Sequence, residues 1–167
     1  MPLKCLPSGD MSASNQVGFE PEEIRTDEPT RSARLKWVII IDERLPVGRA
    51  ANAAVCVAAA TPPAVTGLLG PEAKDASGGV HPGLPWAGCA VLGASVAQLS
   101  AIRAKAADSL GVFVADMPAA AQTTRIYDEY VRKVGETDAD HLEYHAISLV
   151  GPRTRIDKLV HRLPLLR

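Results

Sequence analysis

Apolar and polar positions alternate in blocks from residue 34 onward, and the blocks predict strands followed by helices. Leu35–Asp42 is a continuous, largely β-branched apolar run, typical of a strand that is covered on both faces. Residues 49–60 are nearly all alanine and predict a helix, which must end at Thr61-Pro62-Pro63 because proline lacks the backbone donor. The same patterns predict strands over 88–94, 112–116 and 142–150, and helices over 95–110, 124–134 and from Pro152 onward. This alternation indicates an α/β fold, with a mixed four-stranded sheet and helices on both faces.

Two segments lack such periodicity. Residues 1–33 mix Ser, Gly, Pro, Glu and Asp with few large apolar side chains, so they bury too little surface to offset the entropy of ordering. We therefore expect a flexible tail over 1–33 and one domain over 34–167. Residues 64–86 are rich in glycine and proline and predict a long loop, with one helical turn near 65–69.

Composition narrows the class of protein. Residues 1–33 carry 3 basic and 6 acidic side chains and the remainder 15 and 13, a charge excess too small for a purely electrostatic nucleic-acid binder. Cys5, Cys56 and Cys89 form no CxxC pair, which argues against a disulfide scaffold or a zinc ribbon. No apolar run approaches the roughly 20 residues of a membrane span, and the first residues lack a signal-peptide core. We expect a cytoplasmic protein with reduced cysteines, no membrane partner, no metal and no cofactor.

Polar side chains gather where ligands bind in α/β proteins. Two predicted strands end in an acid, Asp42 and Asp116. If both strands run the same way, these carboxylates share a sheet edge with the start of the alanine-rich helix, where anions and polar ligands bind. Arg49, Asn52 and Cys56 follow on one face of that helix. Two plainer interpretations stay open: Asn52 and Cys56 as buried helix residues, and Asp42 as a turn residue.

Other motifs have simple structural explanations. Residues 93–97 come close to a nucleophile elbow around Ser95, but the final glycine is missing. Ser95 and Gln98 also form a capping box, which accounts for the pattern without any chemistry. His141 and His145 lie on one strand face only if that strand begins early, and two histidines without a third ligand are poor evidence for zinc.

The order of these segments resembles a known superfamily. Lys36–Ala60, the unit that ends at Asp116 and the closing stretch 149–166 are similar in order to the type-2 peptidyl-tRNA hydrolases. Within that superfamily the chain resembles more closely a bacterial branch, the domain-of-unknown-function two-thousand family. The stretches that carry this resemblance are 45–54, 81–86, 120–122, 127–130, 150–152 and 163–167. The resemblance implies the hydrolase fold and a homodimer.

The hydrolase chemistry does not transfer with the fold. The family's histidine late in the first helix is matched by Ala58, or by Cys56 after a two-residue shift. Its Gly-Lys-Gly-Lys motif becomes residues 48–51, Gly-Arg-Ala-Ala, and its threonine after the third strand is matched by Ala120, although Asp116 matches its aspartate. Peptidyl-tRNA hydrolysis by the family's route is therefore not expected, because the group that would handle the proton is missing.

Three hypotheses remain. The first is a small-ligand binding or regulatory module without catalysis, whose cleft is built from Asp42, Arg49, Asn52, Asp116 and Gln122. The alternative is a hydrolase of altered specificity for an acyl or aminoacyl (tRNA-linked) bond, with Cys56 as nucleophile and Asp116 as acid or base. The third is a tRNA-binding remnant that uses Arg49 with the basic tract Arg153, Arg155 and Lys158, which is otherwise an ordinary solvated helix face.

Overall fold

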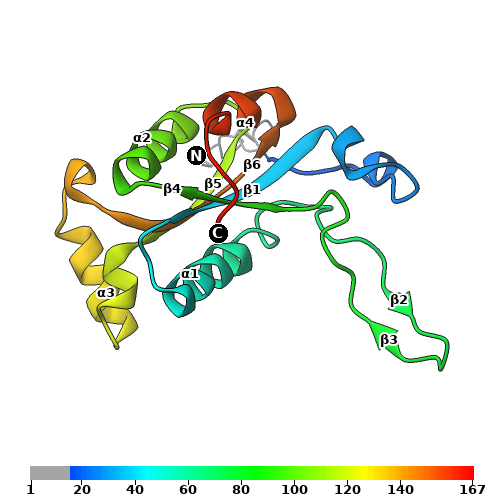
Figure 1. Ribbon diagram of the computed structural model, residues 1–167, viewed down its shortest axis with the longest axis horizontal. Helices are drawn as coiled ribbons and strands as arrows, with labels where there is room; N and C mark the ends of the chain where they lie inside the picture. The colour runs from blue at the N-terminus through cyan, green and yellow to red at the C-terminus, as the bar shows by residue number, and fades with distance from the viewer. Residues whose placement is uncertain (1–15) are drawn as a thin grey trace, which may run out of the picture.

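The computed structural model describes residues 16–167, and its centre is a four-stranded mixed sheet (Figure 1). The strands are β1 (Leu35–Asp42), β4 (Ala90–Ala94), β5 (Phe113–Pro118) and β6 (Tyr144–Pro152). Their order is β4-β1-β6-β5; β1 and β4 are parallel, and β6 is antiparallel to both β1 and β5. β1, β4 and β5 therefore run the same way, and the mixed four-stranded α/β fold predicted from the sequence is confirmed.

Helices cover both faces of this sheet. The helices are α1 (Val47–Ala60), α2 (Val96–Ala107), α3 (Tyr127–Gly135) and α4 (Arg153–Val160). Figure 1 shows α1 on one face, α2 and α4 on the other, and α3 toward the side of α1. None of the helices within residues 16–167 combines the length and the apolar character of a membrane span.

The continuous apolar run of β1 follows from this layering. Ile39 and Ile41 point into a core with Val57 of α1, whereas Val38 and Ile40 point into a second core with α2 and α4. Since alternate residues of a strand point to opposite faces, a strand covered on both sides is apolar wherever both cores enclose it, here from Trp37 to Ile41.

The capping box at the start of α2 is confirmed. The Ser95 hydroxyl accepts a hydrogen bond from the Gln98 backbone N–H at 3.3 Å, and the Gln98 Oε1 accepts one from the Ser95 N–H at 2.9 Å. Ser95 is therefore a helix cap rather than a nucleophile. α2 ends at Ala107, earlier than the predicted residue 110, and Leu110 is left 70% exposed after the helix end.

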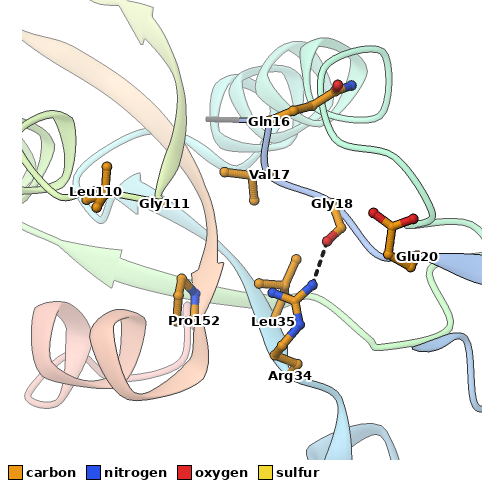
Figure 2. Close-up of a pocket in the computed structure, with 9 residues that line it drawn as sticks. All are labelled: Gln16, Val17, Gly18, Glu20, Arg34, Leu35, Leu110, Gly111 and Pro152. Atoms are coloured by element: carbon orange, nitrogen blue, oxygen red, sulfur yellow. Dashed lines mark hydrogen bonds between the residues drawn. The ribbon is translucent and has the colours of Figure 1, made fainter. Parts of the chain in front are cut away.

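The segment before β1 packs against the domain from residue 16 onward. The Phe19 side chain is 4% exposed, its ring centroid lies 4.8 Å from that of Trp86, and its backbone N–H donates to the Thr66 carbonyl at 3.0 Å. Figure 2 shows the Arg34 guanidinium donating to the Gly18 carbonyl oxygen, at 2.9 Å.

The folded unit therefore begins before residue 34. Residues 16–33 do not behave as the flexible tail expected from their composition, because one aromatic anchor and one arginine fix them to the sheet. The predicted tail over residues 1–15 lies outside the described residues. Between this segment and the sheet a small hollow of about 250 Å³ remains, whose lining includes Gly18, Arg34 and Pro152 (Figure 2).

The long glycine- and proline-rich loop is more ordered than predicted. It carries a projecting hairpin of β2 (Ala73–Lys74) and β3 (Val80–His81), which Figure 1 shows standing away from the sheet. Its turn is held by the Asp75 carboxylate, which accepts the backbone N–H groups of Ser77 and Gly79 at 2.8 and 2.9 Å. The helical turn expected near residues 65–69 is wrong: Val65 and Leu68 are buried in a stretch of turns and isolated bridges.

Candidate functional site

A cavity of about 630 Å³ opens between α1, the edge strand β5 and the segment that leads into α3. Its polar lining comes from all three elements: Asn52, Cys56, Asp116, Arg125, Tyr127 and Tyr130. Apolar side chains, among them Met117 and Ile126, complete the wall. The cavity therefore combines an apolar surface with a few polar groups, as small-molecule sites do.

The register of α1 decides which of its side chains reach this cavity. The helix buries Ala50, Ala53 and Val57 against the sheet, at i, i+3 and i+7 spacing. Asn52 and Cys56 are offset from that stripe by one position, so both are exposed and line the cavity. The interpretation of these two residues as buried helix residues is wrong.

Gln122 holds Asn52 in one orientation. The Gln122 Nε2 group donates to the Arg49 carbonyl oxygen at 2.9 Å and to Asn52 Oδ1 at 3.0 Å, while Gln122 Oε1 lies 2.8 Å from His145 Nδ1. A backbone carbonyl can only accept, so the amino group of Gln122 must face Arg49 and its carbonyl oxygen must face His145. His145 Nδ1 therefore carries a proton.

A β-bulge places His145 in this network. Met117 of β5 pairs with Ala146 of β6, but the next pair is Pro118 with Tyr144, so His145 has no partner. Strict alternation would put His145 on the face of Ile147, which packs with α2 and α4. The bulge turns the ring toward Gln122 and α1 instead, as bulges near functional sites commonly do.

His145 is thus a site residue that the sequence reasoning missed. The sequence suggests only a pairing of His145 with His141 as zinc ligands, and no sequence pattern marks the bulge. Across residues 16–167 no group of three or more His, Cys, Asp or Glu side chains is arranged to hold a metal ion.

The two predicted strand-end acids do not meet. Asp42 is 3% exposed, and its carboxylate accepts three hydrogen bonds from Arg44, each at 3.1 Å. Burial raises the pKa of Asp42, but these hydrogen bonds outweigh it and the net pKa is lowered. Asp116 lies within β5 rather than at its end, and its carboxylate accepts from Arg103 Nε of α2 at 2.9 Å. Both acids are therefore held by arginines, although Asp116 also borders the cavity.

The five predicted ligand-binding residues are thus divided. The structure joins Asn52, Gln122 and the backbone carbonyl of Arg49 in one network beside the cavity. The exposed Arg49 side chain and the Asp42 carboxylate do not line it. Both candidate catalytic residues, Cys56 and Asp116, border the cavity.

Two of the basic residues at the closing helix, Arg153 and Arg155, bind backbone carbonyl oxygens of neighbouring segments. Arg153 donates to the carbonyl oxygens of Ala33 and Thr30 at 3.2 Å each, and Arg155 donates to that of Leu110. α4 also covers the sheet face opposite to α1, which carries Arg49 (Figure 1). These cations do not form one continuous surface for a phosphate backbone.

We expect His145 to titrate below its ordinary pKa of 6.5. Burial lowers the pKa of His145, the negative charge of Asp42 opposes that shift, and the Arg49 charge adds to it. Because the unfolded chain then binds the proton more readily, this group makes the fold less stable as the pH falls from about 6.5 through the folded-state pKa. NMR titration of the His145 ring protons should also show a higher His145 pKa in Arg49→Gln. The His145 pKa should not change in the control Arg132→Gln, because the Arg132 side chain pairs with Glu136 at the end of α3. A midpoint at or above 6.5 in the native protein would contradict this assignment.

Comparisons with known proteins agree with the fold and leave the activity open. A family model described as a protein of unknown function (DUF2000) matches residues 35–167. A solved structure, described as the protein of unknown function Atu0240 from Agrobacterium tumefaciens strain C58, superposes with a TM-score of 0.71 at 16% sequence identity. The superposition covers 79% of this chain and 97% of that one, so the two share a fold. None of the curated proteins matches the chain.

Proposed function

The chain belongs to the DUF2000 family of proteins of unknown function, and we propose that it is a binding module for a small ligand, with the cavity between α1, β5 and α3 as its site. A volume of about 630 Å³ falls within the range of small-molecule pockets. The proposal follows from the site, since neither the family description nor the structural neighbour names a ligand.

The observation that carries the proposal is the fixed orientation of Asn52 at the cavity wall. An exposed asparagine on a helix normally samples several rotamers, and ordering it on binding costs free energy. Here Gln122, itself held by the Arg49 carbonyl and by His145, fixes the Asn52 side chain through its Oδ1. A polar wall group that is held in place before a ligand arrives is typical of a binding site.

Mass spectrometry of the freshly purified native protein, followed by denaturation of the same sample, tests the proposal. We expect a small molecule that stays bound in the native spectrum and is released on unfolding. The same purification of Asn52→Ala should yield less of it, while Thr137→Ala, just after α3 and outside the cavity, should yield the same amount. Occupancy that is unchanged in Asn52→Ala would place the ligand elsewhere and contradict the proposed site.

We extend the proposal to the fold family and the assembly. The succession of an apolar strand, an alanine-rich helix and a strand that carries Asp116 supports a type-2 peptidyl-tRNA-hydrolase-like fold. We propose that the protein is a cytoplasmic bacterial one. Exposed apolar side chains on α1, Val47 and Val55, and on the loop arm, Val80 and Leu84, support a homodimer. Light scattering across a range of protein concentrations tests the dimer, and a monomer at all of them would contradict it.

A second candidate function is a hydrolase of altered specificity that acts on an acyl or aminoacyl bond. The observation that favours it is the exposure of Cys56 on the cavity wall, where its thiol can meet a bound ligand. A nucleophilic cysteine requires such access, which a core cysteine would lack.

Thiol labelling separates Cys56 from the other cysteines. We expect iodoacetamide to modify Cys56 in the native protein, because its side chain is exposed. Cys89 should react mainly after denaturation, because burial raises the pKa of its thiol to about 12. Peptide mapping locates each label, and Cys56→Ser provides the matched control. A Cys56 that reacts only after denaturation would rule out its role as nucleophile.

A further inference from the structure

We infer that the ligand of this cavity is a small carboxylate with a flat apolar body. The inference rests on the binding proposed above and goes further, because it derives the ligand class from the donors and charges of the wall. Three features carry it: the polarity of Asn52, the charges on the wall and the arrangement of the aromatic rings.

Asn52 presents a hydrogen-bond donor to the ligand. Its Oδ1 is already occupied by the Gln122 amino group, at 3.0 Å. The amide nitrogen of Asn52 makes no hydrogen bond to any other residue between 16 and 167, and the residue is exposed at the cavity wall. The ligand atom that meets it must accept a hydrogen bond, as a carboxylate or carbonyl oxygen does.

The uncompensated charge on the cavity wall is positive and belongs to Arg125. Arg125 lines the cavity and forms no ion pair within the described part of the chain. The opposite charge on the wall, Asp116, is compensated by Arg103, which contacts its carboxylate from the other sheet face at 2.9 Å. A guanidinium without a partner attracts a carboxylate and repels a cationic ligand.

The remaining wall suits a flat apolar group. Tyr127 and Tyr130 pack edge to face, with ring centroids 5.5 Å apart, and Ile126 and Met117 lie in the same lining. Aromatic rings favour offset or edge-on contact with another ring. Burial raises the pKa of Tyr130, so its phenol stays protonated and adds a donor rather than a negative charge.

Three ligands with one carbon skeleton test the inference: phenylacetate, phenylacetamide and phenethylamine. They carry a carboxylate, a neutral amide and a cation on the same ring. Titrations followed by two-dimensional NMR report on the Asn52 side-chain amide directly. We expect phenylacetate to shift the Asn52 resonances and to bind about tenfold more tightly than the amide, and the amine to bind weakest.

Variants connect that preference to the named groups. Arg125→Gln should weaken phenylacetate about five- to tenfold and leave phenylacetamide unchanged, because only the charged ligand loses a partner. Arg132→Gln, in α3 and outside the cavity, should change neither affinity. Asn52→Asp should abolish phenylacetate binding, because it replaces a donor by a negative charge.

The outcomes separate this inference from the binding proposal. Binding of the amide or the amine as tight as that of phenylacetate, with shifts at Asn52, would overturn the carboxylate and leave the binding module standing. An unchanged affinity of Arg125→Gln for phenylacetate would also overturn the carboxylate and leave the binding module standing. If none of the three ligands shifts Asn52, the inference is overturned, and the release of a native ligand on unfolding decides the binding module separately.

Discussion

Replacing Phe19 by alanine is expected to lower the free energy of unfolding by about 3–4 kcal/mol, as for other buried phenylalanines. The ring is 4% exposed and lies in the core on the α1 face, in contact with Trp86. Its removal leaves a cavity between the N-terminal segment and the loop at residues 65–68 and deprives the Trp86 ring of a packing partner. Urea denaturation followed by circular dichroism gives the change in free energy.

The size of this effect distinguishes a packed segment from a flexible one. A side chain in a flexible tail contributes nothing to folding, so its replacement would leave the free energy of unfolding unchanged. The control is Val131→Ala on α3, where the side chain is 52% exposed and a change within about 0.5 kcal/mol is expected. A Phe19→Ala value as small as that control would show that residues 16–33 do not stabilise the domain.

Ser148→Ala is expected to cost about 2–3 kcal/mol, a large effect for the loss of one oxygen atom. Ser148 is completely buried in β6. The Trp37 indole N–H donates to its hydroxyl at 2.8 Å, and the Ser148 and Thr61 hydroxyls lie 2.8 Å apart. Thr61 in turn donates to the Val57 carbonyl oxygen, so the hydrogen bonds run from the sheet to the end of α1. Alanine leaves the indole N–H buried without an acceptor, which costs its full desolvation free energy.

Chemical denaturation of a matched serine variant isolates the effect of burial. Ser109→Ala removes a partly exposed hydroxyl that donates to the Lys105 carbonyl oxygen one turn earlier, and should change the free energy of unfolding by at most about 0.5 kcal/mol. The near-ultraviolet signal of Trp37 should also change in Ser148→Ala. Equal and small effects of the two replacements would contradict the network.

The network around Gln122 predicts that ligand binding tolerates a change in the charge of His145. His145 Nδ1 donates to Gln122 in the neutral ring, and protonation occurs at Nε2, so this hydrogen bond persists in both states. The orientation of Asn52 is therefore kept when His145 titrates. The His145 ring supports the Gln122 and Asn52 side-chain amides through Nδ1, while Nε2 makes no hydrogen bond to any described residue.

The local elements were determined by the sequence itself. The unbroken apolar run of β1 required burial on both faces, which only a sheet between two helical layers provides. The alanine content of α1 and the prolines after Thr61 set the end of that helix, and the Ser95–Gln98 box set the start of α2, because propensity and capping act over a few residues. The class of fold followed from the order of these elements.

The candidate site was decided by the tertiary structure. Helical spacing predicts that Asn52 and Cys56 share one helix face, but whether that face meets the sheet or the solvent depends on which stripe of α1 packs on the sheet. Asp116 was recognised as a polar residue at a strand, yet its ion pair with Arg103 arises from the packing of α2 on the opposite face.

His145 and Phe19 show most clearly what local patterns omit. The position of His145 depends on an extra residue in the pairing of β5 with β6, and a bulge has no consistent sequence signature. Phe19 stands in a segment with a composition typical of disorder, and its contacts with Thr66 and Trp86, far along the chain, order it. The sequence by itself determined the four strands of the main sheet, the main helices and their layers, because apolar periodicity, propensity and capping act over a few residues. The tertiary structure decided the site, because contacts between residues far apart in the chain select which side chains meet.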